Sequence, residues 1–298
     1  KPELFPMGIG TTLDTALERQ PGVDVSRIQE IGTAVDDDSI RLRGFGARRI
    51  VAAQDGRVLN TSGVAGGYFI DWTLVPLLNV EKFEVIKGVA DPRYGNTLGG
   101  IVNMVSRKPP RETPDTILQV QSAEYDTLSL SFYHAWTIGS LEYSVGYSEN
   151  ESDGYLRNGA LESKNFDLHL GYDFPNNDQF TFDASFVDLR KGFIVNNRTS
   201  NDPDDPDYYV PDDPAYPVSD GEYMYGGMGA YPEDGSWWQK EKWLLDFGYN
   251  RKFNDGKGRF DLRFWLNNGS REAYNTRASA GRVFHKEWYD DRSSGASL

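Results

Sequence analysis

The chain of 298 residues is 38% hydrophobic and 26% charged, which is typical of a folded protein and argues against wholesale disorder. Its net charge of −14 argues against a protein that binds nucleic acid through the phosphates, because such binding requires a basic face. Cysteine is absent, which excludes disulfides and thiolate metal sites, and no apolar run approaches the roughly 18 residues of a membrane-spanning helix.

Residues 1–111 show a mixed α/β pattern. Thr11 or Thr12 can cap a short helix that carries Leu17 and ends at Pro21-Gly22. Short β-type runs, separated by glycine-rich turns, follow at residues 39–43, 50–53, 82–86 and 101–105. This region is predicted to form a small α/β domain.

From residue 112 the pattern changes to alternation in segments of about ten residues, the length of a tilted strand that crosses a bilayer. In one segment Phe166 and Leu168 fall on one face, and Asp167 and His169 on the other. The segments number about seven and cover residues 118–122, 128–136, 141–147, 166–174, 180–186, 243–249 and 260–266. The fold is therefore predicted to be mainly β, with antiparallel transmembrane barrel strands over residues 112–298.

The connections between these segments also alternate in length. Residues 138–139, 175–178 and 254–258 suit tight turns, whereas residues 150–163 and 189–239 are long. Short turns at one rim and long loops at the other are the layout of an outer-membrane barrel. A soluble antiparallel sandwich is the alternative, because its strands alternate too.

Four motifs in the first region occur in the order and spacing of a known family. Residues 39–46 read SIRLRGFG, residues 49–56 read RIVAAQDG, residues 80–88 read VEKFEVIKG, and RYG at 93–95 precedes LGGIVNMVSRKP at 98–109. Together they resemble the plug of TonB-dependent outer-membrane receptors. The family has proline where this chain has Val89, which leaves the glycine turn possible but removes a fixed φ.

The resemblance implies a plug domain over residues 1–111 and the N-terminal portion of a transmembrane β-barrel over residues 112–298. It implies uptake of a scarce ligand, most commonly a ferric siderophore or similar metal chelate, through the outer membrane of a Gram-negative bacterium, without enzymatic chemistry or a cofactor. The implied partners are TonB on the periplasmic side, outer-membrane lipid and the small-molecule ligand. Two alternatives remain: a non-transporting surface module for ligand capture or adhesion, and one half of a split two-chain barrel.

Arginines in the short strands of the first region are candidates for contacts between plug and barrel. Inward carboxylates of the barrel, such as Asp167, Asp173, Asp183 and Asp246, could pair with them and still exchange for water. The candidate arginines are Arg41, Arg43, Arg93 and Arg107. Solvated surface positions are the alternative for each of them.

Ligand contacts are expected, by the same resemblance, from the plug apex and the long loops. Aromatic side chains in these segments could stack on a planar ligand or pack the loop against itself. At the apex they are Tyr68, Phe69 and Trp72, and in the long loop they are Tyr208, Tyr209, Tyr223, Tyr225, Trp237 and Trp238.

Catalytic and metal sites have little support. His134, His169 and His285 are scattered, and no hydrolase, P-loop or zinc-protease motif occurs. The long loop contains six aspartates, Asp202, Asp204, Asp205, Asp207, Asp212 and Asp213, but prolines interrupt the spacing of a Ca²⁺ loop. A solvated acidic loop is the favoured interpretation over a Ca²⁺ site.

About seven strands are a third of the roughly 22 that plugged transporter barrels use. We therefore expect either a fragment or partly traced receptor, or a second polypeptide that completes the barrel. The first residues lack the basic and apolar segments of a secretory signal, and a TonB box is not recognisable before Thr11.

Overall fold

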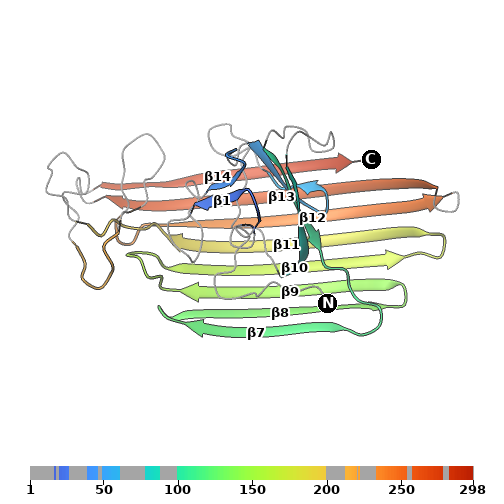
Figure 1. The fold of residues 1–298 in the computed structure, drawn as a ribbon, viewed down its shortest axis with the longest axis horizontal. Coiled ribbons are helices and arrows are strands. Elements are labelled where there is room, and N and C mark those ends of the chain that lie inside the picture. The colour runs from blue at the N-terminus through green and yellow to red at the C-terminus, as the bar shows by residue number, and fades with distance from the viewer. Residues whose placement is uncertain are drawn as a thin grey trace.

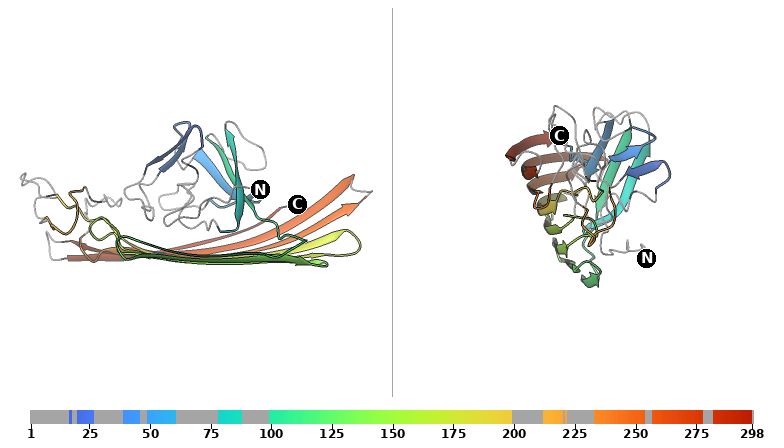
Figure 2. Two further views of the ribbon diagram at one scale, coloured as in Figure 1. Left: turned by 60° about the horizontal axis from the view of Figure 1, so that its bottom comes forward. Right: turned by 90° about the vertical axis from the view of Figure 1, so that its left-hand side faces the viewer.

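The computed structural model describes residues 17, 20–26, 39–45, 49–60, 78–87, 99–198, 212–219, 221, 233–253, 257–277 and 282–297. Within this part of the chain the strands form three sheets. Eight long strands make one curved sheet, here called the wall, and two small sheets lie on its concave side, as Figure 1 and Figure 2 show. Over the described ranges, no helix has the length and apolar character needed to span a membrane.

The wall is a meander in which each strand pairs antiparallel with its neighbour in the chain. All seven expected strands are present, each of them longer than expected, and the sequence did not predict the eighth, β14. In order across the sheet they are β7 (Asp115–Ala123), β8 (Thr127–Ile138), β9 (Leu141–Ser152), β10 (Leu161–Asp173), β11 (Asp178–Gly192), β12 (Trp237–Phe253), β13 (Gly258–Arg277) and β14 (Arg282–Ser297).

The connections divide the wall into two rims. Residues 139–140, 174–177 and 254–257 join strands at the short-turn rim, which lies on the right of Figure 1. The two long connections, residues 153–160 and 193–236, both leave from the opposite, long-loop rim. The predicted tight turns and long connections are present, but the long-loop rim also carries the three-residue turn 124–126 between β7 and β8.

The outer face of the wall carries an apolar band. Each edge of the band is a row of residues that pair directly across four strands, and the edge nearer the long-loop rim is here called the upper one. Toward the short-turn rim, one row of the band is Leu141, Tyr172, Phe180 and Tyr249. Its upper row is Tyr147, Phe166, Phe186 and Trp243. The next outward-facing row is charged on all four strands: Glu149, Lys164, Asp188 and Glu241. These two apolar rows are roughly 20 Å apart at 3.3 Å per residue, close to the apolar height of outer-membrane barrels.

The two small sheets, here called the plug sheets, come from the first region. One pairs β1 (Val23–Ser26) with β2 (Ser39–Leu42), and the other has the order β4-β3-β6-β5. The strands of the second sheet are β3 (Ile50–Gln54), β4 (Arg57–Val58), β5 (Val80–Lys87) and β6 (Gly100–Ser106). Strands β2, β3, β5 and β6 match the four predicted runs, whereas β1 and β4 were not predicted.

The main core lies within the plug, and one residue of the wall packs against it. Ile50, Ala52 and Met104 from β3 and β6 pack in one buried cluster with Leu244, which comes from the wall strand β12. Leu17 belongs to the same cluster and is fully buried, whereas the remainder of the predicted helix lies outside the described residues. The inner face of the wall therefore completes the hydrophobic core of the plug sheets.

Candidate functional site

The tight turn between β3 and β4 contacts the wall. Asp55 and Gly56 both have positive φ, 48° and 80°, as a two-residue hairpin turn of the primed type requires. The Asp55 carboxylate accepts hydrogen bonds from the backbone N–H of Ser106 at 3.0 Å and from its hydroxyl at 2.6 Å. The Gly56 N–H donates to Oδ1 of Asn103 at 3.0 Å. Strand β6 thus fixes the turn from both sides.

Arg57, the first residue after this turn, reaches a carboxylate of the wall. Its Nη1 lies 2.9 Å from Oδ2 of Asp246 in β12, and the two side chains are 3% and 0% exposed. Nε of Arg263 in β13 lies 2.8 and 2.9 Å from the two oxygens of the same carboxylate. Burial lowers the pKa of the Arg57 guanidinium, and the Asp246 carboxylate opposes that shift. One buried carboxylate therefore holds an arginine from the plug sheets and one from the wall.

The turn has a further bond to the wall. Nη1 of Arg263 donates to the backbone carbonyl of Asp55 at 2.8 Å. Arg263 therefore bridges the wall carboxylate and the plug turn, and the two arginines close a hydrogen-bonded ring around Asp246. Charge-assisted bonds of this kind are about twice as strong as neutral ones, so this junction is a strong polar link between the two parts.

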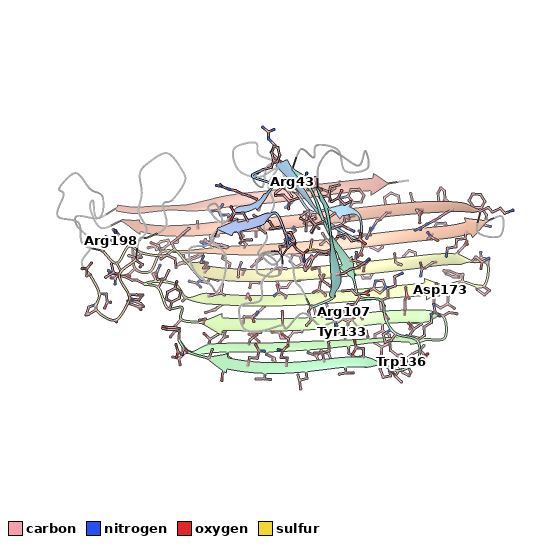
Figure 3. The ribbon with its side chains drawn as sticks, viewed as in Figure 1. Arg43, Arg107, Tyr133, Trp136, Asp173 and Arg198 are labelled. Carbon is pink, nitrogen blue, oxygen red and sulfur yellow. The ribbon has the colours of Figure 1, made fainter. Side chains whose placement is uncertain are left out.

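A second junction lies between the end of the plug sheets and strand β8. Leu78 packs in a buried cluster with Tyr133 and Ala135 of the wall. The guanidinium of Arg107 lies 5.6 Å from the centroid of the Tyr133 ring, and Figure 3 shows both residues beside each other. A cation over an aromatic ring at this distance is attractive. This junction is mainly apolar, unlike the one at Arg57.

The four predicted arginines lie in different settings. Arg41 and Arg43 are exposed, and Arg93 lies outside the described residues. Arg107 does contact the wall, through the Tyr133 ring. The plug residue on one of the expected carboxylates, Asp246, is Arg57, which the sequence reasoning did not single out.

Other polar side chains line the wall near Asp246. His169 pairs in register with Asp183, which in turn pairs with Asp246 across the next strand. Its Nδ1 lies 2.7 Å from Oδ1 of Asp183, and its Nε2 lies 3.6 Å from Oε1 of Glu142. Across the described ranges, no group of three His, Cys, Asp or Glu side chains is arranged to hold a metal ion.

The two neighbouring tryptophans at the start of β12 point to opposite faces, because successive strand residues alternate. Trp238 is fully buried on the inner face with Leu161, Leu189 and Phe193. Trp237 lies on the outer face, where its ring stacks on Tyr274 with centroids 6.1 Å apart. Trp238 therefore points to the side on which the plug sheets lie, but its indole is covered by neighbouring side chains, whereas Trp237 points away from that side.

The other seven predicted ligand residues all lie outside the described part of the chain. They are Tyr68, Phe69, Trp72, Tyr208, Tyr209, Tyr223 and Tyr225. Of the six loop aspartates, only Asp212 and Asp213 are among the described residues. The sequence reasoning also missed Arg157 and Asn158, which are buried and partly buried at the long-loop rim and donate hydrogen bonds to a second loop.

Comparison with known protein families shows which family the first region matches. Residues 7–101 match the model of the TonB-dependent Receptor Plug Domain. The chain carries a TonB-dependent receptor plug. The match spans β1 to β5 and the start of β6, and so includes the Asp55-Gly56 turn and Arg57.

Solved structures share the fold of the plug together with the wall. The ferric yersiniabactin uptake receptor FyuA of Yersinia pestis is 17% identical, with a TM-score of 0.65 over 91% of this chain and 40% of its own. The pyoverdine outer membrane receptor FpvA of Pseudomonas aeruginosa PAO1 is 14% identical, with a TM-score of 0.67 over 96% and 40%. The FrpB iron transporter of Neisseria meningitidis is 15% identical, with a TM-score of 0.67 over 97% and 43%.

This chain therefore spans about two fifths of the length of each of these receptors. At these identities the likeness establishes the fold: the wall corresponds to part of a receptor barrel, and the plug sheets lie on its inner side. The predicted fold, a plug followed by an incomplete antiparallel barrel, is confirmed.

Proposed function

We propose that this protein is a TonB-dependent receptor of the outer membrane of a Gram-negative bacterium that takes up a scarce ligand, a ferric siderophore or similar metal chelate. The observation that carries the proposal is the plug seated on the polar inner face of a wall whose outer face is an apolar band. An enzyme of the sandwich type would not need an apolar outer band with in-register edges. The uptake receptor FyuA and the pyoverdine-bound FpvA share this fold, which supports the choice of ligand class.

The geometry suggests how the plug can be both held and released. Arg57 and Asp246 are attached by ionic hydrogen bonds, which water can replace once the plug begins to move. Water cannot replace the apolar contact at Leu78 in this way. Its separation exposes the buried side chain to water and loses the free energy gained by burying it. During a pull by TonB from the periplasmic side, water could therefore replace the polar bonds at Arg57 but not the apolar contact at Leu78.

The wall as described has two unpaired edges. Among the described residues, β7 pairs only with β8, and β14 pairs only with β13. Unpaired backbone groups cannot face lipid, so further strands must close the sheet, and plugged transporters use about 22 in all. We propose that residues 1–111 are the plug, that residues 112–298 begin the barrel, and that the remainder of the receptor supplies the missing strands.

We propose ligand contacts at Tyr68, Phe69 and Trp72 of the plug and at the aromatic residues of the loop 193–236. Trp237 is omitted because it faces outward, and Trp238 because its indole is fully buried. The chemistry is binding and passage, without covalent steps.

Uptake of radioactive iron tests the function. The full-length receptor is expressed in iron-starved cells that lack their own chelate receptors, and ⁵⁵Fe is supplied as a citrate, a hydroxamate or a catecholate complex. Uptake of at least one chelate that disappears in cells without TonB is expected. Uptake that persists without TonB, or after deletion of the plug, would favour a capture module without active transport.

A further inference from the structure

Two loops at the long-loop rim are tied together by the side chain of one residue. Asn158, in the loop 153–160, donates through Nδ2 to the carbonyls of Phe193 and Ser236, each at 2.7 Å. Its Oδ1 accepts from the N–H of Gly235 at 3.1 Å. Phe193 begins the loop 193–236 and Ser236 ends it, so a single amide holds both stems of the longer loop.

The neighbouring residue, Arg157, adds a second set of ties. Its Nε lies 2.9 Å from Oδ1 of Asp234, and a second nitrogen of the guanidinium also contacts this carboxylate. The Arg157 carbonyl accepts from the N–H of Val195 at 3.0 Å. The hydrogen bond to Asp234 raises the pKa of Arg157, so the guanidinium stays charged over the physiological range. Arg157 and Asn158 are together called the clasp.

Asn197 links the stem of the long loop that begins at Phe193 to a further segment of that loop, residues 212–219. Its Nδ2 lies 3.0 Å from the carbonyls of Asp213, Tyr216 and Pro217, and its Oδ1 accepts from the Asp213 N–H at 2.8 Å. Nη1 of Arg157 lies 3.5 Å from the same Oδ1. Residues 212–219 are thereby linked through Asn197 to the clasp.

The backbone around the clasp is fitted to it. Asn158 has φ of +60°, a conformation that asparagine tolerates better than most residues. A Cβ at Gly192 would overlap the carbonyl oxygen of Asn158, so a side chain there would force the two loops apart. The stem residues Ile194 and Val195 are fully buried, which adds apolar packing to the hydrogen bonds.

We propose that the clasp joins the loop 153–160 and the described stems of the loop 193–236 into one mechanical unit, so that neither loop can open without the other. Arg157 and Asn158 are then positioning residues for the ligand contacts proposed for the loop 193–236. The claim about ligand contact rests on the proposed function, whereas the joining of the loops does not.

Hydrogen exchange of the full-length receptor in detergent tests the joining directly. Asn158→Asp keeps the shape and the acceptor but loses both Nδ2 donors, and Asn158→Gly keeps the positive φ without any side chain. Each lost hydrogen bond contributes about a factor of five to the opening equilibrium, and both variants lose at least two. In both variants, amides of residues 193–197 and of residues 233–236 should exchange at least roughly tenfold faster. The increase should be similar in the two stems.

The matched control is Asn176→Asp, which removes a comparable side-chain bond to Asp178 at the opposite rim. It should leave exchange at the long-loop rim unchanged. The reversed pair Arg157→Asp with Asp234→Arg should restore the protection that Arg157→Asp alone removes. Faster exchange confined to residues 153–160, or in only one of the two stems, would overturn the proposal.

Uptake of the three ⁵⁵Fe chelates tests the positioning role. For a chelate that the unaltered receptor transports, Asn158→Asp should raise KM roughly tenfold and leave the maximal rate unchanged, because the wall and plug are intact. An unchanged KM in a variant whose loops have lost protection would refute the positioning role. If the unaltered receptor takes up none of the chelates, the proposed function fails, while hydrogen exchange still decides whether the clasp joins the loops.

Discussion

The wall and the plug sheets use the same kind of strand in two different ways. In the wall, every second side chain faces inward and the others form the apolar band, so burial alternates along β8 and β12. In the plug sheets, β3 and β6 pair in parallel and are buried on consecutive residues, as strands covered on both faces are. The wall is therefore specified by periodicity, and the plug by a small number of particular contacts with the wall.

The largest effect is expected at the plug junction, where one contact carries much of the attachment. Asp246→Ala leaves Arg57 buried without its partner carboxylate and should lower the free energy of unfolding by about 3–5 kcal/mol. Urea titration of the full-length receptor in lipid vesicles measures it. The control Asp173→Ala removes an exposed pair with Arg111 and should cost at most about 1 kcal/mol. Similar losses in both variants would mean that burial does not distinguish the two pairs.

A second comparison separates the two faces of one strand. Trp238→Ala removes a fully buried indole and should lower stability by about 3–5 kcal/mol. Trp237→Ala removes one stacked ring on the outer face and should lower it by about 1 kcal/mol. The same urea titration applies, and a larger loss for Trp237 would contradict the assignment of faces.

A third comparison tests the apolar band itself. Phe264 is 51% exposed and lies within the band, so Phe264→Arg would be harmless on a soluble sheet. In a bilayer the charge should cost about 2–4 kcal/mol. Ser270→Arg, in the charged row above the band, should cost no more than about 1 kcal/mol. Equal and small losses in vesicles would show that this face does not meet lipid.

The smallest effect is expected at the second junction. Arg107→Ala removes the cation from the Tyr133 ring and should lower stability by about 0.5–1 kcal/mol. Lys108→Ala, at an exposed neighbouring position, should change nothing measurable. A loss above 3 kcal/mol, of the size expected for a broken buried pair, would mean that Arg107 has the anchoring role assigned to Arg57.

Most of the wall could be predicted from the sequence because its signal repeats. Phe166, Leu168 and Leu170 alternate with polar residues as the fold requires, and so do the outward residues of β11 and β13. The eighth strand was not predicted because residues 282–297 have charged and small residues at both odd and even positions, so neither face of the strand is consistently apolar. The upper parts of β12 and β13 were underestimated for a related reason: above the band both faces of the sheet are largely polar, and alternation disappears.

The functional residues were harder to predict because their contacts join distant parts of the chain. Arg57 is 189 residues from Asp246, and β4 is only two residues long, too short for a periodic signal. Its place directly after the Asp55-Gly56 turn was the only available hint. Asn158 had no signal at all, since its partners are backbone carbonyls of another loop.

The height of the wall has a consequence for recognition from outside the cell. Strand β12 continues six residues above the upper row of the apolar band, from Trp243 to Trp237, which is roughly 20 Å along the strand. In a bilayer this places the outer stack of Trp237 and Tyr274 well clear of the headgroups. For the outer-membrane receptor proposed above, an antibody fragment that binds the outer face around Trp237 and Tyr274 would therefore mark the protein on intact cells without reaching the inner side of the wall.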